Sequence, residues 1–211
     1  MTEKHRILFS DFDGTITARE SLEAVLKEFA SEKYDDMMKR LKSGEVTIRE
    51  GVREMVEAIP SAKYPEIIRF VKDIPIRPGF ESLLDFLEQK GIPFIVLSGG
   101  LRGMVEARLG PLVERAYRII AADVDTNGTH LKVFSDYEMG TELVAKAEVM
   151  KAFAADEQIV IGDGITDFQM ARHADTVFAR DSLAAFLDKS GLFYYPWADF
   201  FEIRDKLETL V

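Results

Sequence analysis

Three short apolar runs recur along the chain, and each ends at polar or glycine residues. The runs are Ile7 to Phe9, Ile92 to Leu97 and Ile159 to Ile161. Uncharged runs of this length are typical of strands that are buried on both faces of a parallel sheet. Segments with helical periodicity separate them, and alternation of strands and helices favours a doubly wound α/β fold. We therefore expect a parallel sheet with helices on both of its faces.

A block of helical pattern interrupts this alternation directly after the first run. In residues 17–75 the apolar positions recur at helical spacing, without a strand pattern. Two segments fit the capping box that opens helices, Thr17 to Glu20 and Thr47 to Glu50. We predict an α/β core of residues 1–16 and 76–211, with residues 17–75 as a small helical cap over the end of the first strand.

The remaining pattern predicts further elements of the core. Strands are expected at 117–121, 176–179 and 193–195, and helices at 80–90 and 142–153. Residues 123–134 contain Asn127-Gly128, a strong signal for the turn of a hairpin. The segment Ser98-Gly99-Gly100 follows the second run and is expected to open a helix.

Composition narrows the functions open to this chain. Its 211 residues carry a formal net charge of -10 at pH 7, whereas nucleic acids and anionic membranes need a basic face on their partner. The absence of cysteine excludes disulfides and thiolate metal sites, and the three histidines share no zinc-ligand spacing. No signal peptide opens the chain, and no apolar run approaches the roughly 20 residues that span a bilayer. We expect a cytoplasmic protein with a small-molecule partner, and without nucleic-acid or membrane partners.

The residues after the first run carry the clearest chemical signal. Asp11 and Asp13 are two positions apart, so both side chains leave the strand end on the same side, and Gly14 and Thr15 follow at once. Ligands of open parallel sheets bind beyond the carboxyl ends of the strands. Two close carboxylates repel each other unless a cation lies between them. The pattern suits a magnesium ion beside one nucleophilic and one acid/base carboxylate, and the alternative is a solvated turn.

Two other strand ends and one helix add polar groups. Ser98, with Gly99 after it, could bind a phosphate at a helix N-terminus, or could be an ordinary N-cap. Asp163 and Asp167 lie four positions apart after the third run, so that one could reach a metal while the other holds the site from behind. Helix capping is the alternative for both. Lys146 could supply a fixed positive charge to a phosphate, or could be solvated like most lysines.

Taken in order, these motifs resemble the four motifs of the haloacid dehalogenase superfamily. They are Asp11 to Thr15, Ser98, Lys146 and Gly162 to Asp167. The helical insert resembles the cap of the phosphoserine-phosphatase-like group of that superfamily. Within this group, five segments resemble the phosphatases of methionine salvage, namely 50–52, 76–80, 93–94 with 98–100, 178–181 and 199–204.

The resemblance implies a mechanism and a set of site residues. Asp11 would attack phosphorus and form an aspartyl-phosphate, and Asp13 would protonate the leaving group and then activate water. The implied magnesium site consists of Asp11, Asp13 through its carbonyl and Asp163, with Asp167 behind them. The implied phosphate-binding residues are Gly14, Thr15, Ser98, Gly99 and Lys146.

The substrate is expected to be a small phosphate ester, and the clues to its identity conflict. Glu20 resembles the glutamate that binds the substrate amine in phosphoserine phosphatases. Arg53 could bind an acidic substrate, but Met55 is at the position expected for the phosphoserine-binding arginine and suits an apolar methylthio chain. We favour 2-hydroxy-3-keto-5-methylthiopentenyl-1-phosphate over phosphoserine. A small-molecule phosphotransferase remains an alternative, and a phosphoaspartate receiver would need neither Asp13 nor a cap.

Overall fold

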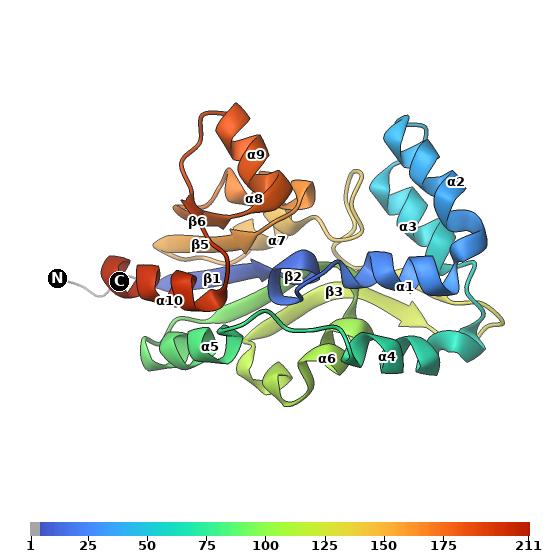
Figure 1. Ribbon diagram of the computed structural model, residues 1–211, viewed down its shortest axis with the longest axis horizontal. Helices are drawn as coiled ribbons and strands as arrows, with labels where there is room; N and C mark the ends of the chain where they lie inside the picture. The colour runs from blue at the N-terminus through green and yellow to red at the C-terminus, as the bar shows by residue number, and fades with distance from the viewer. Residues whose placement is uncertain (1–4) are drawn as a thin grey trace.

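The computed structural model describes residues 5–211, so the first four residues of the predicted core lie outside it. Within the described residues, seven strands form one sheet in the order β4-β3-β2-β1-β5-β6-β7 (Figure 1). The strands are β1 (Arg6–Asp11), β2 (Phe94–Leu101), β3 (Arg118–Asp125), β4 (Lys132–Phe134), β5 (Glu157–Gly162), β6 (Thr176–Ala179) and β7 (Tyr195–Pro196). All neighbouring pairs are parallel except β3 with β4 at one edge.

Helices cover both faces of this sheet, which confirms the predicted doubly wound α/β fold. The core helices are α5 (Phe80–Gln89), α6 (Arg102–Leu109), α7 (Lys146–Lys151), α8 (Phe168–Ala171), α9 (Asp181–Lys189) and α10 (Phe200–Leu210). Leu8 of β1 packs with α5, α6 and α10, whereas its neighbours Ile7 and Phe9 pack with α7, α8 and α9. Side chains alternate between the two faces of a strand. The single apolar run of β1 therefore contributes side chains to the hydrophobic cores on both faces of the sheet. In Figure 1 the two groups of helices lie below and above the sheet.

Four helices lie between β1 and α5, in the segment with the helical pattern. They are α1 (Ser21–Phe29), α2 (Ser31–Lys42), α3 (Ile48–Val56) and α4 (Tyr64–Lys72). Their apolar faces form a third core that includes Met37 and Met55, and this core continues onto Leu101 and Met104 of the sheet side. The chain enters this helical block near Thr17 and leaves it near Ile76. An antiparallel bridge between these two residues holds the two connections together.

Local sequence signals explain two of these elements. Thr47 and Glu50 form the predicted capping box, with the Glu50 N–H donating to Thr47 Oγ1 and the Thr47 N–H donating to the Glu50 carboxylate. Such a cap satisfies N–H groups that the first helical turn leaves free. The predicted hairpin is also present: β3 pairs with β4 in antiparallel register, and the Asn127 amide groups donate to Asp125 in the connecting turn.

Three sequence-based boundaries were wrong. Thr17 and Glu20 form no capping box, because α1 begins at Ser21 and Glu20 makes no side-chain cap bond. Strand β2 extends to Leu101, so Ser98 lies within a strand instead of opening a helix. The helix expected at 142–153 is only α7, since residues 137–145 fold back on themselves through backbone bonds before it. Strand pairing extends β2, whereas the shorter α7 follows from backbone bonds within the segment before it.

Candidate active site

Sheet register brings the polar strand ends to one level. Asp11 of β1 pairs with the residue before Ser98 on β2, while Ser10 pairs with Ile161 on β5. Ser98 and Asp163 therefore each lie one residue beyond the level of Asp11. The carboxyl ends of neighbouring parallel strands share an edge, which is where open α/β sheets bind ligands.

A buried acidic cluster forms at this edge around one lysine. Carboxylate oxygens of Asp11, Asp163 and Asp167 lie within 4.8 Å of one another, a spacing that could hold a metal ion. Lys146 Nζ contacts Asp11 Oδ1 and donates to Asp167 Oδ1 at 2.7 Å. All four side chains are buried. Because water is largely excluded, the charges act on one another through a low dielectric.

The cluster shifts the pKa values of its members. Burial alone would lower the pKa of Lys146, but the carboxylates of Asp11 and Asp167 outweigh it and raise that pKa. Burial raises the pKa of Asp11 well above its ordinary value, although Lys146 opposes the shift. Burial also raises the pKa of Asp163 to about 6, against the hydrogen bond from Thr15. Three acids share one lysine, and a cation would offset the remaining negative charge.

Asp13 connects the strand end to the helical block above it. Its Oδ1 accepts the N–H groups of Ser21 and Leu22, each at 3.0 Å, and also contacts the Ser21 hydroxyl. Its Oδ2 accepts the Ser98 hydroxyl at 3.0 Å. The carboxylate thus satisfies free N–H groups at the N-terminus of α1, the role that the sequence suggested for Thr17.

The turn after Asp13 is pressed against Asp163. Gly14 has a φ of 82°, and a Cβ built on it would lie 2.4 Å from Asp163 Oδ2, so only glycine fits. Thr15 donates its hydroxyl to Asp163 Oδ1 at 2.5 Å. On the other side, Asp167 Oδ2 accepts the N–H groups of Asp163 and Gly164 at 3.1 and 3.0 Å. Asp163 is therefore held from both sides, and Asp167 supports it from behind.

Above the cluster lies a cavity of about 180 Å³. Its floor includes Asp11 and Asp167 of the acidic cluster together with Lys146, and its wall comes from the helical block. The wall side chains are Leu22 of α1 and, one helical turn apart on α3, Ile48 and Val52. The other lining residues are Asp13, Glu20, Gly99, Gly100, Gly164 and Thr166. One end of the cavity is therefore charged and the other apolar.

Two predicted specificity residues do not line this cavity. Met55 is 2% exposed and belongs to the core between α1, α2, α3 and α4. Arg53 pairs with Glu138 at 2.6 Å and with Glu57 at 3.9 Å, which ties α3 to the loop before α7. The helical period explains the difference, because the α3 face toward the cavity carries Ile48 and Val52. The assignment of Met55 and Arg53 as substrate contacts thus stays a prediction that this cavity does not support.

Glu20 does line the cavity. The residue as a whole is exposed, but its carboxylate lies near Gly14, where a built Cβ would be 2.8 Å from Glu20 Oε1. Loss of solvent, together with the charges of Asp13 and Asp163, raises the pKa of Glu20 to about 8. Of the two roles weighed for Glu20, the structure excludes helix capping and leaves a position at the cavity.

Ser98 and Gly99 are brought to the site by a different geometry from the expected one. Helix α6 begins at Arg102, so no helix N-terminus is available directly after Ser98. Instead, Ser98 Oγ accepts the Gly100 N–H at 3.0 Å while it donates to Asp13. The hydroxyl is thereby fixed beside Asp13, within the distorted end of β2, where the register with β3 shifts.

Sequence reasoning missed five residues that shape the site. Four of these come from the helical block: Ser21 bonds to Asp13, and Leu22, Ile48 and Val52 line the cavity. The apolar three stood at helical spacing in the sequence, which was their signal. Arg77 is the fifth: it donates to the carbonyl oxygens of Gly14 and Thr15 at 2.6 and 3.1 Å. Its signal was the segment 76–80, which carried part of the family resemblance but gave Arg77 no role.

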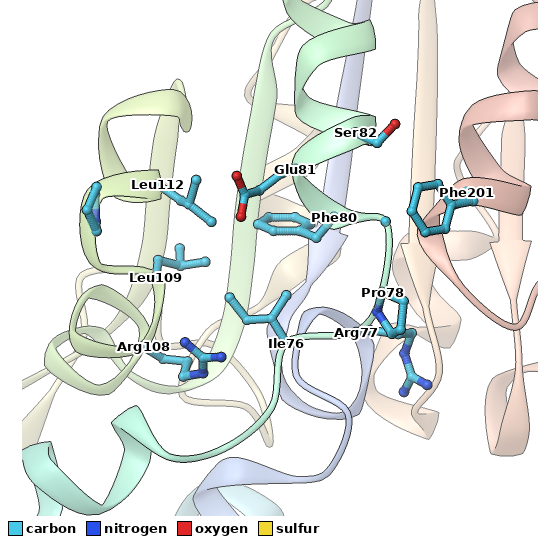
Figure 2. Close-up of a pocket in the computed structure, with 12 residues that line it drawn as sticks. Ile76, Arg77, Pro78, Phe80, Glu81, Ser82, Arg108, Leu109, Leu112 and Phe201 are labelled. Atoms are coloured by element: carbon cyan, nitrogen blue, oxygen red, sulfur yellow. The ribbon is translucent and has the colours of Figure 1, made fainter.

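A larger groove of about 630 Å³ lies elsewhere, along the linker that carries Arg77 and the start of α5 (Figure 2). Ile76, Phe80, Leu109, Leu112 and Phe201 are among its lining side chains. The groove holds none of the clustered carboxylates and lacks Lys146. The smaller cavity is therefore the candidate active site, since the chemistry rather than the volume identifies it.

A profile of the haloacid dehalogenase-like hydrolases matches residues 8–172. The chain belongs to the haloacid dehalogenase-like hydrolases. Proteins named 2-hydroxy-3-keto-5-methylthiopentenyl-1-phosphate phosphatase are similar over nearly the whole chain. The protein of Microcystis aeruginosa is 46% identical over 204 residues, which cover 96% of this chain and 97% of that protein. That of Geobacillus kaustophilus is 32% identical over 215 residues, with 98% and 97% coverage. The family and these relatives together make the chain a hydrolase of phosphoric monoesters.

Solved structures agree at the level of the fold. A phosphoserine phosphatase from T. onnurineus superposes with a TM-score of 0.72 at 19% identity, covering 95% of this chain and 93% of its own. A substrate-bound phosphoserine phosphatase complex gives 0.70 at 20% identity, with 98% and 99% coverage. Among the described residues, no helix is long and apolar enough to cross a membrane.

Proposed function

We propose that this chain is a Mg²⁺-dependent phosphatase that hydrolyses 2-hydroxy-3-keto-5-methylthiopentenyl-1-phosphate through an aspartyl-phosphate intermediate. The observation that carries the proposal is the two-ended cavity, with buried carboxylates and a lysine at its floor and Leu22, Ile48 and Val52 along its wall. The names of the full-length relatives support the same substrate. In this proposal residues 17–75 are the cap that presents the wall, and residues 76–211 complete the core.

The residues of the acidic cluster fit a magnesium ion. Magnesium prefers hard oxygen ligands, and the cluster offers carboxylates from Asp11, Asp163 and Asp167, with Asp13 beside them. Gly14 leaves room for the Asp163 carboxylate, because a Cβ at position 14 would overlap Asp163 Oδ2. Asp167 already accepts three hydrogen bonds, so its role is to hold Asp163 and Lys146. When bound, the ion supplies positive charge beside the transferring phosphoryl group.

Asp11 is the proposed nucleophile. Its carboxylate attacks phosphorus in line, the bond from phosphorus to the ester oxygen breaks, and an aspartyl-phosphate remains. Asp13 gives a proton to the departing ester oxygen. In the second half it takes a proton from water, which attacks the same phosphorus, releases inorganic phosphate and restores Asp11. Asp13 is suited to both steps because it lies at the cavity edge and holds no ion pair among the described residues.

Lys146 and Ser98 are the proposed ligands of the remaining phosphate oxygens. Lys146 is buried between two carboxylates, and its pKa is raised, so it stays charged throughout turnover. Ser98 can turn its hydroxyl from Asp13 toward a phosphate oxygen, and Gly99 lines the cavity without a side chain to obstruct the ester. Gly14 and Thr15 shape the turn beside them. Charge stabilisation of this kind usually contributes most of the rate acceleration in phosphoryl transfer.

The wall supports an apolar substrate tail. A methylthio chain matches aliphatic side chains, and roughly 0.8 kcal/mol is gained for each methylene that leaves water. A carboxylate such as that of phosphoserine needs a cationic partner in a closed pocket. Among the described lining residues of this cavity, Lys146 is the cation, and the acidic cluster already engages it.

Phosphoserine is the second candidate, and Glu20 is the observation that favours it. A carboxylate at the cavity edge could bind a substrate ammonium group, and Glu20 is suitably located. Transfer to a small acceptor instead of water uses the same first half-reaction and is distinguished only by the acceptor.

The test compares kcat/KM for the two substrates at saturating Mg²⁺. We expect the methylthio enol phosphate to exceed phosphoserine by more than about tenfold, because the wall stabilises only the former. Glu20→Gln should leave that ranking unchanged. If phosphoserine is preferred by tenfold and Glu20→Gln removes the preference, the methylthio assignment is wrong. Release of inorganic phosphate with and without added alcohols identifies the acceptor.

A further inference from the structure

The turn that follows Asp13 is held by a residue outside the four family motifs. Among the described residues, the carbonyl oxygens of Gly14 and Thr15 accept no hydrogen bond from a regular helix or strand. The Arg77 guanidinium donates one hydrogen bond to each of them. Its Nη2 donates to Gly14 O at 2.6 Å, and its Nε donates to Thr15 O at 3.1 Å. The Arg77 N–H also donates to Ile16 O at 2.9 Å. The linker from the helical block is thus fastened along the whole turn.

Arg77 is itself held by an aromatic platform. Its guanidinium lies 5.2 Å from the ring centre of Trp197, and the Arg180 guanidinium lies 5.1 Å from the same ring. Both distances are within the range of cation–π attraction. Trp197 is 5% exposed, and its Nε1 has no hydrogen-bond partner among the described residues. What this indole offers the site is therefore its face rather than its N–H.

Arg180 belongs to a second turn that also contacts Asp163. It donates to Asp181 Oδ2 at 2.8 Å and to Ala198 O at 3.0 Å. In the next residues of that turn, Ser182 Oγ and the Leu183 N–H donate to the main-chain carbonyl of Asp163, at 3.2 and 2.8 Å. The first turn bonds the side chain of Asp163 through Thr15. Two turns therefore hold opposite ends of one residue, and one tryptophan joins them.

We infer that the arginine–tryptophan stack of Arg77, Trp197 and Arg180 positions Asp163 and the turn after Asp11, and thereby sets both the turnover rate and the affinity for the divalent cation. Arg77 is a positioning residue: it acts through Gly14 and Thr15. The inference rests on the proposed phosphatase mechanism but not on the identity of the substrate.

Direction and contacts separate Arg77 from its neighbour Arg108. Both arginines line the groove, but Figure 2 shows Arg77 pointing away from Leu109 and Leu112, whereas Arg108 of α6 lies beside Leu109. Arg108 Nε contacts the carbonyl of Ile74, so it also ties a guanidinium to a main-chain oxygen near this linker. It reaches neither Gly14 nor Thr15. Arg108→Met is therefore a matched control for Arg77→Met.

The experiment measures kcat and KM with p-nitrophenyl phosphate, and the Mg²⁺ concentration that gives half of the maximal rise in Tm. For Arg77→Met we expect kcat to fall about 30- to 100-fold and the Mg²⁺ midpoint to rise about tenfold, with KM changed less, as for other residues that orient a metal ligand. Arg77→Lys should lie between it and the wild type, because an ammonium keeps the charge but not the two-pronged geometry. Arg108→Met should stay within about threefold in both readouts, even if its Tm falls.

Trp197 supplies an independent arm of the test. Trp197→Phe keeps an aromatic face and loses only an unpartnered N–H, so it should retain more turnover and a lower Mg²⁺ midpoint than Trp197→Leu. Melting of each metal-free variant establishes that it is folded. If Arg77→Met does not fold, Arg77→Lys and the Trp197 pair carry the test.

The inference is overturned if Arg77→Met or Arg77→Lys matches the wild type in kcat and Mg²⁺ midpoint, or if Arg108→Met loses as much as Arg77→Met. Equal behaviour of the two Trp197 variants also overturns it. Failure of the proposed mechanism gives a different result, because Asp11→Asn would then keep its activity. The Mg²⁺ midpoints of the Arg77 and Trp197 variants would still show whether the stack positions Asp163.

Discussion

The floor and the wall of the cavity are built in opposite ways. At the floor, Asp11, Lys146 and Asp167 are at most 4% exposed, and Lys146 contacts both carboxylates directly. At the wall, Ile48 is 44% exposed and makes no polar contact through its side chain. Floor residues come from the sheet ends and α7, whereas wall residues come from helices inserted into the fold.

This difference separates two tasks. Floor groups must be fixed to within fractions of an ångström, because charge stabilisation and in-line attack depend on geometry. The wall needs only shape and apolar character, which several aliphatic side chains provide equally well. We therefore expect substitutions at the floor to change the rate by orders of magnitude, and those at the wall to change substrate preference by small factors. The following experiments test that contrast, beginning with its largest expected effect.

Asp11→Asn should reduce turnover by about 10⁴-fold or more, since an amide cannot act as the nucleophile. The metal-free protein should not melt at a lower temperature, because the change removes one of three carboxylates crowded around Lys146. Turnover and Tm are measured beside Asp205→Asn, which removes an exposed carboxylate paired with Arg204. Activity within about tenfold of the wild type in Asp11→Asn would show that the floor does not contain the nucleophile.

Asp13→Asn should slow the reaction by about 10²- to 10⁴-fold, the usual contribution of general acid–base catalysis. The amide oxygen can still accept the N–H groups of Ser21 and Leu22, so α1 should keep its start. Because the water step also loses its base, the phosphorylated protein should accumulate and be detectable by mass spectrometry. Unchanged burst and steady-state rates would assign the proton transfers to another group.

The same division explains what the sequence predicted and what it did not. Asp11, Asp13 and Asp163 follow short apolar runs, and the shared edge of a parallel sheet brings such positions together whatever the details of packing. Lys146 was found through the order of the motifs, although the helix around it is shorter than its pattern suggested. Local chemistry and topology were sufficient for the floor.

The wall was predicted poorly because it depends on tertiary contacts. The rotation of α3 about its axis decides whether Met55 or Val52 faces the cavity, and helical spacing alone allows either. Thr17 and Glu20 matched a capping box, but Asp13 reaches the N-terminus of α1 from another element. Arg77 lies 62 positions from Thr15, and its bond to that carbonyl leaves no local signal.

The acidic floor should make magnesium binding depend on pH. The pKa of Asp163 is raised to about 6, above its unfolded value, so its ionisation destabilises the metal-free fold above that pH and the penalty disappears as the pH falls. Bound Mg²⁺ needs the ionised form and reverses this preference. The rise in Tm on adding Mg²⁺ should therefore be larger at pH 7.5 than at pH 5, and the Mg²⁺ midpoint should increase up to about tenfold per unit of pH below about 6. Asp163→Asn should lose most of this dependence. An equal rise in Tm at both pH values would contradict it.

The smallest expected effect is at the wall. Ile48→Ala removes apolar surface from the cavity wall, where the proposed substrate tail binds, so kcat/KM for the methylthio enol phosphate should fall about three- to tenfold. The value for phosphoserine, which has no apolar tail, should change by less than about twofold. Steady-state kinetics on both substrates give the ratio directly.

Met55→Leu is the matched control for this last experiment, because Met55 is an apolar residue of the same helix that faces the core instead of the cavity. A swap of similar volume in a core costs less than about 1.5 kcal/mol, so it should lower Tm slightly and leave the substrate ratio unchanged. If Met55→Leu shifts that ratio and Ile48→Ala does not, the sequence-based assignment of Met55 is correct and the wall is not where the substrate is selected. If Ile48→Ala shifts both substrates equally and by orders of magnitude, α3 belongs to the catalytic machinery, and the division between floor and wall fails.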